Sequence, residues 1–193
     1  MVTVRRPRLL TLSEYLSLER SAPSRSEYVR GEIYAMTGGT ARHSLISANT
    51  IRALGNRLDN NRCRVFDSNL RLWVEAADLV TYPDVMVVCG KVQFLDDKPA
   101  DTVANPAVVV EVLSPSTEAF DRGDKFAAYR LVPSLRHYVL VSQDRPQVEV
   151  FTRTETTAFV PSVALGMDAQ LLLPHLELSI PLADLYAGAW DPE

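Results

Sequence analysis

Cysteine, histidine and lysine are scarce in this chain of 193 residues, with two, three and three copies respectively. The cysteines, Cys63 and Cys89, form no Cys-x-x-Cys pair, which excludes a thiolate zinc motif and fits a reducing compartment. His43, His137 and His175 lie too far apart in sequence for a His-Glu-x-x-His motif. We therefore expect a cytoplasmic protein without the common zinc motifs.

Long apolar runs and low-complexity tracts are missing as well. No apolar stretch approaches the roughly 18 residues that a membrane-spanning helix needs. Residues 1–8 are basic, but no adequate apolar segment follows them, so we expect neither a signal peptide nor a membrane partner. With 47% apolar and 23% charged residues, the chain can build one substantial core. We expect a single domain over residues 1–193.

The net charge of −4 argues against avid, nonspecific binding to nucleic acid, but the charge is unevenly distributed. Residues 1–75 carry twelve arginines against seven acidic residues, and residues 76–193 carry eight basic against seventeen acidic residues. The basic half could face a phosphate backbone while the acidic half holds a metal ion. A preference for arginine over lysine, without functional meaning, explains the same numbers.

The order of predicted elements indicates the fold class. Helical periodicity is found over residues 12–19, 41–60, 123–132 and 182–187. Strand patterns are found over residues 28–36, 64–67, 70–75, 82–88, 108–113, 136–142, 147–153 and 171–173, with Gly31 as a bend in the first and residues 91–105 as a surface loop. This order predicts an α/β or α+β domain with a mixed β-sheet flanked by α-helices.

Two acidic residues on apolar strands are the strongest candidates for chemistry. Asp84 follows Pro83 where one strand begins, and Glu111 interrupts the run 108–113, which is otherwise entirely valine and leucine. A carboxylate buried in such a strand needs a cation, a proton or several hydrogen-bond donors. A turn role for Asp84 and an arginine partner for Glu111 are the structural alternatives.

A metal ion shared by Asp84 and Glu111 satisfies both carboxylates at once. Mg²⁺ uses few carboxylates, keeps several waters and accepts phosphate oxygens, so a two-acid site suits phosphodiester hydrolysis. We expect Mg²⁺, with Mn²⁺ as a substitute.

Lys125 adds a cation to this prediction. On a helix it shares a face with Ala128, Tyr129 and Val132, which directs its ammonium group toward the sheet that carries Glu111. There it could orient the attacking water or stabilise charge on the phosphate. A solvated lysine, or a helical partner of Asp121, is the alternative.

Two further residues remain open at this point. His43 belongs to the stripe of the 41–60 helix that continues through Ser47, Ile51, Leu54 and Leu58, where a buried structural histidine and a role near the phosphate both fit. Glu32 lies on the less apolar side of its strand, where it could support the metal or simply face solvent.

These patterns resemble a known group of enzymes. Pro83-Asp84 opening a strand, Glu111 in a later strand and a nearby lysine resemble the PD-(D/E)xK, or restriction-endonuclease-like, superfamily. A closer resemblance is to the Uma-two family of endonucleases, carried by Ser26-Glu27-Tyr28-Val29-Arg30-Gly31-Glu32, Gly38, His43, Tyr82-Pro83-Asp84 and Val110-Glu111-Val112-Leu113-Ser114-Pro115-Ser116-Thr117 with Asp121, Lys125 and Tyr129.

The resemblance implies a restriction-endonuclease-like core with Asp84 and Glu111 as Mg²⁺ ligands, and it adds Glu32 and His43 to the site. One position departs from the superfamily, because Leu113 stands where its lysine normally follows the glutamate. The resemblance implies that Lys125, on the next helix, replaces it.

We therefore expect a Mg²⁺-dependent endonuclease that hydrolyses phosphodiester bonds of nucleic acid, with DNA the favoured partner. Two alternatives remain: an inert nuclease-like scaffold that binds nucleic acid or protein, and a hydrolase of small phosphoesters. A homodimer is compatible with such a sheet, although no residue demands it.

Overall fold

The computed structural model describes residues 8–36, 38–59, 62–96 and 98–190. Its centre is a six-stranded mixed sheet in the order β11-β10-β9-β8-β6-β3. The strands are β3 (Cys63–Asp67), β6 (Val85–Cys89), β8 (Val108–Leu113), β9 (His137–Ser142), β10 (Gln147–Arg153) and β11 (Phe159–Leu165). Strands β8 and β9 are parallel, and the other neighbours are antiparallel. The predicted mixed sheet is confirmed.

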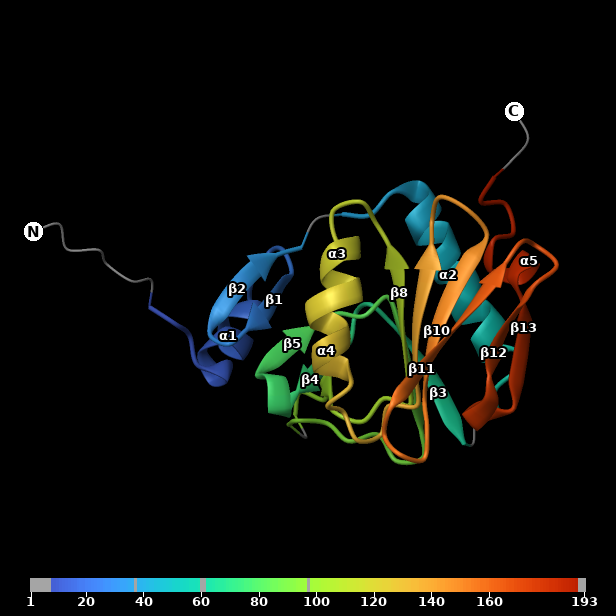
Figure 1. Ribbon diagram of the computed structural model, residues 1–193. Helices are drawn as coiled ribbons and strands as arrows, with labels where there is room; N and C mark the ends of the chain where they lie inside the picture. Colours follow the sequence, from blue (N-terminus) through green and yellow to red (C-terminus); the bar gives the residue numbers. More distant parts are fainter. Residues whose placement is uncertain (1–7, 37, 60–61, 97, 191–193) are drawn as a thin grey trace, which may run out of the picture.

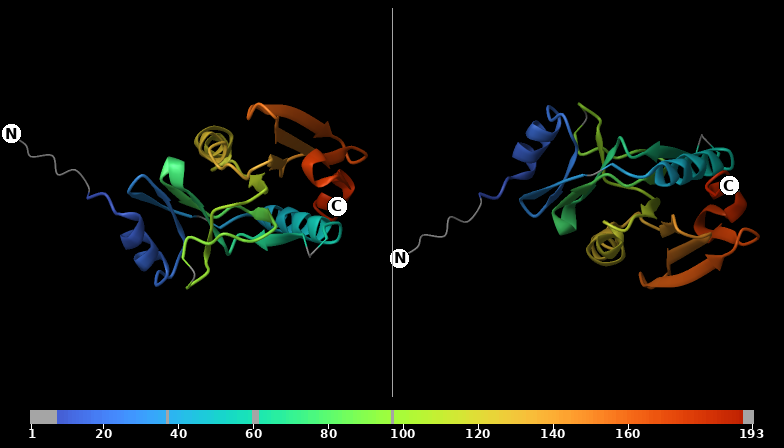
Figure 2. Two further views of the ribbon diagram at one scale, coloured as in Figure 1. Left: turned by 90° about the horizontal axis from the view of Figure 1, so that it is seen from below. Right: turned by 90° about the horizontal axis from the view of Figure 1, so that it is seen from above.

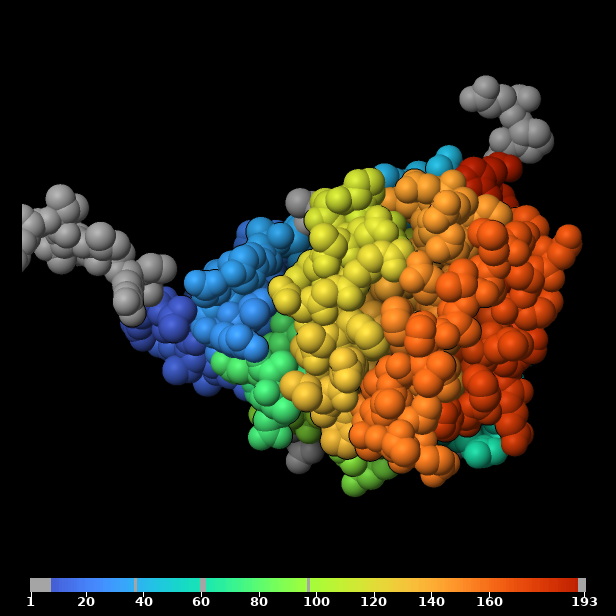
Figure 3. Space-filling model, in the orientation of Figure 1, coloured from blue at the N-terminus to red at the C-terminus, as the bar shows by residue number. Residues whose placement is uncertain are grey.

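Helices cover both faces of this sheet (Figures 1 and 2). On one face lies α2 (Ala41–Gly55), packed with the valines at positions 110 and 112 of β8. On the other face lies a continuous helical segment, yellow in Figure 3, made of α3 (Glu118–Phe120), a π-helical turn η2 (Asp121–Lys125) and α4 (Phe126–Tyr129). Because side chains alternate along a strand, Glu111 points to the face of α4. The predicted helices are present, but the one expected over residues 123–132 starts earlier, at Glu118, and the one expected over residues 41–60 ends earlier, at Gly55.

A second sheet of five strands lies beside the first, in the order β2-β1-β5-β4-β7. It contains β1 (Ser26–Val29), β2 (Glu32–Ala35), β4 (Arg71–Val74), β5 (Leu79–Thr81) and the short β7 (Thr102–Val103), with the 3₁₀ turn η1 (Glu75–Ala77) between β4 and β5. Helix α1 (Leu12–Glu19) covers this sheet and begins with a capping box between Thr11 and Glu14. The sequence pattern did not reveal β5 or β7.

The expected strand over residues 28–36 is in fact a hairpin, so that prediction was wrong in one respect. Arg30 and Gly31 both have positive φ angles, of 50° and 93°, and form the two-residue loop of a primed turn. Strand β2 therefore folds back on β1, with Val29 opposite Glu32. All four residues of β2 are exposed. Gly31, which was predicted as a bend within one strand, is part of a turn that reverses the direction of the chain.

The C-terminal part completes the cover of the α2 face. It consists of the hairpin β12 (Gln170–Leu173) and β13 (Leu178–Pro181), joined through the 3₁₀ turn η3 (Pro174–Leu176), and of the short helix α5 (Leu182–Leu185). Leu171, Leu173 and Ile180 are fully buried against the sheet. Because burial removes these apolar side chains from water, it stabilises the packing of the hairpin against the sheet.

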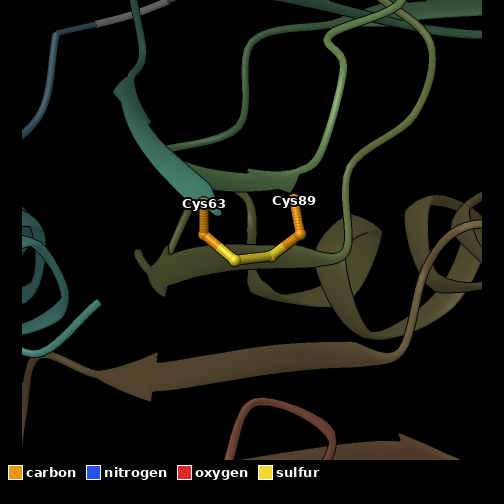
Figure 4. The surroundings of a disulfide bond; sticks show 2 residues. All are labelled: Cys63 and Cys89. Carbon is orange, nitrogen blue, oxygen red and sulfur yellow. A yellow bond between two sulfur atoms is a disulfide. The ribbon is translucent and has the colours of Figure 1, made fainter. Parts of the chain in front are cut away.

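Cys63 and Cys89 lie opposite each other on β3 and β6 and are joined by a disulfide (Figure 4). The structure therefore differs from the expectation of two reduced cysteines, and the cytoplasmic location stays a prediction. Among the helices of the described residues, none is long and apolar enough to cross a membrane.

Candidate active site

Asp84 and Glu111 lie at one end of the six-stranded sheet, on neighbouring antiparallel strands. Val85 pairs with Val110, which places Asp84 directly across from Glu111. Asp84 N donates to Glu111 Oε2 at 3.4 Å, and Asp84 Oδ2 accepts a hydrogen bond of 2.7 Å from the N–H of Val112, the residue after Glu111. The structure thus brings together the two carboxylates that were predicted to meet.

Lys125 reaches this pair from the helix on the α4 face. Its Nζ atom lies 3.3 Å from Glu111 Oε1 and 3.2 Å from Asp121 Oδ1. The face predicted for Lys125 is confirmed, since Ala128, Tyr129 and Val132 are all buried in the same core. The π-helical turn holds Asp121 and Lys125, and such turns are frequent at functional sites. Lys125 thus lies beside Glu111, the position that the resemblance implied for the lysine absent at Leu113.

Glu27 is a member of the cluster that sequence reasoning missed. It lies on β1, is buried, accepts a hydrogen bond from Thr81 and places Oε1 3.1 Å from Lys125 Nζ. Tyr129 completes the cluster by donating a hydrogen bond to Glu111 Oε1 at 2.8 Å. Glu27 stands in the motif Ser26-Glu27-Tyr28, just before the strand predicted over residues 28–36, whereas the structure starts β1 at Ser26. Its burial depends on β5, which no sequence pattern indicated.

Negative charge exceeds positive charge in this cluster. Glu27, Glu111 and Asp121 surround one ammonium group, and Asp84 lies beside them. Burial raises the pKa of Glu111 well above its usual value, and the nearby acids add to this effect against the attraction of Lys125. Burial likewise raises the pKa of Asp121. The site is therefore short of positive charge.

The excess of acidic residues also raises the pKa of Lys125. Burial by itself lowers the pKa of this ammonium group, but the attraction of Glu111, Glu27 and Asp121 outweighs burial and raises it well above the usual value. Lys125 is thus charged at neutral pH.

Asp121 Oδ1 is paired with Lys125 without the geometry of a directed hydrogen bond, and it has no hydrogen-bond partner among the described residues.

His43 stands on the open side of Asp84. It lies in the first turn of α2, which is capped by Thr40, and its Nε2 atom is 3.3 Å from Asp84 Oδ2. This interaction raises the pKa of the imidazole, against the opposing effect of burial. A Cβ atom at Gly39 would approach within 2.9 Å of His43 Nδ1, so the glycine allows the ring to sit there.

The buried face of α2 differs from the predicted stripe. Ile46, Asn49, Thr50, Ala53 and Leu54 are the buried residues, while His43 and Ser47 are only partly buried and line hollows at the surface. The stripe was therefore displaced by about one position. This places His43 at the site instead of in the core.

Glu32 is not brought to the cluster. It lies on the exposed strand β2, and its carboxylate accepts a hydrogen bond of 2.5 Å from Tyr34. The turn at Arg30 and Gly31 carries it away from the buried side of β1. The glutamate that the hairpin supplies to the cluster is Glu27.

Two hollows open at the site. The inner hollow, about 260 Å³, is bordered by Asp84, Glu111, Asp121, Lys125 and the turn Ser114–Thr117. The outer hollow, about 460 Å³, is bordered by Arg25, Ser44, Ser47 and Ser68. Both hollows also share Met36, Gly38, Gly39, His43 and Asp84 as lining residues. Asp84 and Glu111 can therefore be reached from the surface.

The chemistry of these residues fits Mg²⁺. Carboxylate oxygens are the ligands that Mg²⁺ uses, and a shortage of positive charge favours a cation. Among the described residues no group of three or more His, Cys, Asp or Glu side chains is arranged to hold a metal ion. A pair of acids with several waters is the arrangement that Mg²⁺ commonly adopts beside phosphates. Asp84 and Glu111 are the pair that would hold it.

Comparison with known proteins agrees with this architecture. Residues 12–183 match the model of the Uma2 family, which is described as "Putative restriction endonuclease". Two Synechocystis proteins, the uncharacterized proteins sll1609 and slr1290, are 33% and 38% identical over 92% and 93% of this chain, and the matches cover 100% and 92% of those proteins.

A solved structure shows the same fold. The crystal structure of "a putative nuclease belonging to DUF820" from Anabaena variabilis superposes with a TM-score of 0.74. The match covers 94% of this chain and 99% of the other, at 21% identity. The fold is therefore restriction-endonuclease-like, as predicted. The chain belongs to the Uma2 (Uma-two) family.

Proposed function

We propose that the chain is a Mg²⁺-dependent endonuclease that hydrolyses phosphodiester bonds, with DNA as its substrate. The observation that carries this proposal is the convergence of Asp84, Glu111 and Lys125 in the lining of the inner hollow. Membership of a family described as restriction endonucleases supports the same reaction class. Mn²⁺ is expected to replace Mg²⁺.

The acids and the lysine have distinct roles in this proposal. Asp84 and Glu111 would hold the metal, which when bound lowers the pKa of a coordinated water and polarises the phosphate. Tyr129 and Lys125 hold Glu111 in place through contacts of 2.8 and 3.3 Å. Lys125 also stabilises negative charge that develops on the phosphate. Neighbouring residues restrict the positions of these side chains, and catalysis requires that reacting groups are held in a defined orientation.

His43 has a supporting role on the open side of the site. Its Nε2 atom contacts the same carboxylate oxygen that accepts the hydrogen bond from Val112 N, so it restricts the orientation of Asp84. We assign Glu32 no role in cleavage, because it lies on the exposed strand β2.

A nuclease assay with matched variants tests the proposal. Plasmid and single-stranded DNA are incubated with the wild type, Asp84→Asn and Glu111→Gln in Mg²⁺, Mn²⁺ or EDTA. We expect cleavage by the wild type only with metal, and a loss of at least about 10³-fold in both variants. Circular dichroism should show both variants folded.

Calorimetry separates the proposal from its alternatives. Mn²⁺ should bind the wild type, and Glu111→Gln should abolish that binding. Metal binding independent of Glu111, or cleavage undiminished in both variants, would remove these residues from the mechanism. An inert scaffold would bind DNA without cutting it, and cleavage of nucleotide esters alone would indicate a small-phosphoester hydrolase.

A further inference from the structure

The inner and outer hollows adjoin each other, with Asp84 and His43 between them, and we call the two hollows together the groove. The residues that line both are Met36, Gly38, Gly39, His43 and Asp84. The link that contains Met36 and Gly38–Thr40 leads from β2 to α2 at the same end of the molecule as the turn between β8 and α3 (Figure 1). A ligand in the inner hollow would therefore lie next to the outer hollow, with Asp84 between them.

The two halves of the groove differ in chemistry. The inner half is rich in carboxylates around Lys125. The outer half is lined by Arg25 and by the serines Ser44, Ser47 and Ser68, and Asp84 at the junction is its acidic lining residue. The Ser47 hydroxyl donates to His43 O at 2.9 Å. Hydroxyl groups and arginine are the side chains that most often contact phosphate oxygens of nucleic acid.

Arg25 differs from Arg20 and Arg57, two arginines that carboxylates neutralise. Arg20 pairs with Asp96 and Asp101, and Arg57 with Asp184. In the part of the chain that the structure describes, no carboxylate pairs with Arg25.

Neutral groups hold the Arg25 guanidinium instead. It donates to Ser68 O at 2.8 Å and to the side chain of Asn69, and it lies over the ring of Tyr82, 5.4 Å from the ring centre. Its positive charge is thus oriented but not neutralised, and an arginine offers more donors than these two bonds use.

We propose that the outer half of the groove is a binding site for the backbone of a nucleic-acid strand, with a phosphate next to the scissile one held by Arg25 and Ser44. A hollow of about 460 Å³ lies within the size range of small-ligand sites and suits a nucleotide unit. The inference rests on the proposed function, since it places the scissile phosphate at Asp84 and Glu111. Charge complementarity identifies the partner: a polyanion fits this half of the groove.

A charge series at Ser44 tests the site without disturbing the fold. Ser44 is exposed near the beginning of α2, where an acidic side chain stabilises the helix through its dipole. Ser44→Glu should therefore fold at least as well as the wild type while repelling phosphate. Ser44→Lys reverses the sign of the change. Ala41→Glu is the matched control, because it adds the same charge in the same helical turn but lines a different hollow with Gln143 and Gly188.

Binding is measured by fluorescence anisotropy with a labelled DNA oligonucleotide in Ca²⁺ or EDTA, so that cleavage is not required. We expect Ser44→Glu to weaken binding about tenfold, as one like-charge contact near a surface can do, and Ser44→Lys to strengthen it. Ala41→Glu should change the Kd by less than about twofold, and the differences should shrink in high salt. Arg25→Gln should weaken binding in the same direction as Ser44→Glu.

The outcomes separate this inference from the proposed function. If the Kd rises in the order Ser44→Lys, wild type, Ser44→Glu but the protein does not cleave DNA, the groove is supported and the nuclease proposal is overturned. Metal-dependent cleavage with equal Kd values across the series overturns the groove and leaves the nuclease proposal intact. Equal weakening by Ser44→Glu and Ala41→Glu also overturns the groove, because it would reflect net charge alone.

Discussion

The two faces of the six-stranded sheet each bury polar side chains, but these side chains differ in how their charge and hydrogen bonds are balanced. On the α4 face, Glu111 joins other acids around one lysine, next to an open hollow. On the α2 face, His137 is fully buried, with Nδ1 3.2 Å from Thr152 Oγ1 and with Nε2 accepting from His175 N at 3.3 Å. His137 is neutral and has a hydrogen-bond partner at each ring nitrogen. The acidic residues around Glu111, in contrast, share a single ammonium group.

This difference distinguishes a structural group from a functional one. A buried polar group that is fully hydrogen-bonded contributes to one well-ordered core. A cluster with an excess of one charge costs stability, and it is retained where a ligand can supply the opposite charge. The contrast predicts which substitutions unfold the protein, which change its pH dependence and which affect activity alone.

Loss of the buried ammonium group is expected to have the largest effect. Lys125→Ala leaves Glu27, Glu111 and Asp121 without their cation, and removing one partner of a buried ion pair costs about 3–5 kcal/mol. Urea unfolding should show this loss, and cleavage should fall with it. Lys91→Ala, at an exposed position, is the control and should stay within about 0.5 kcal/mol of the wild type. Equal stability of the two variants would contradict the buried charge cluster.

The second effect is a pH dependence of stability that arises on the α2 face. Burial lowers the pKa of His137 to about 4, with contributions from His175 and Arg136. The unfolded chain takes up this proton near pH 6.5, so the unfolded state gains a proton that the folded state does not hold. Stability is therefore complete above about pH 6.5 and is lost as the pH falls toward 4, by about 3 kcal/mol.

Urea unfolding between pH 8 and pH 4 measures this effect. The variant His137→Gln cannot titrate, so its curve should be flatter than that of the wild type over the same range. His175→Gln removes an exposed imidazole but keeps the backbone N–H that His137 accepts, and it should retain most of the slope. Parallel curves for the wild type and His137→Gln would locate the acid sensitivity elsewhere.

A smaller effect is expected at Glu27, with opposite signs for stability and activity. Glu27→Gln keeps the shape and an acceptor for Thr81 while it removes one negative charge from a cluster that has too many. We expect stability to rise by about 1 kcal/mol, since like-charge repulsion is relieved, and cleavage to fall. A loss of stability would show that Glu27 serves mainly as a structural partner of Lys125. Thermal unfolding and the nuclease assay together decide between the two.

The smallest effect is expected at Glu32, the matched counterpart of Glu27 on the same hairpin. Glu32→Gln changes an exposed side chain whose carboxylate contacts Tyr34. Stability should change by less than about 0.5 kcal/mol and cleavage should be unaffected. A strong loss of cleavage would show that the hairpin β1–β2 moves toward the site when substrate binds.

Much of the site could be predicted because local sequence constrains it. Glu111 had to be buried, as its strand is apolar on both sides, and Lys125 had to face the sheet, as it shares a helical face with Ala128 and Tyr129. Glu27 could not be predicted in the same way. It lies just outside the strand predicted over residues 28–36, and its burial depends on β5, a strand of three residues that pairs with β1.

The sequence by itself determined the helices, most strands of the central sheet, the expectation that Asp84 meets Glu111 and the direction of Lys125, because periodicity and local burial follow from neighbouring residues. Only the tertiary structure decided which glutamate of the hairpin joins them and that Arg25 and Ser44 lie on the same groove. The physical reason is that a two-residue turn reverses the strand direction and so moves Glu32 away. The groove, likewise, is formed by segments far apart in the chain, whose approach is set by packing of the whole domain.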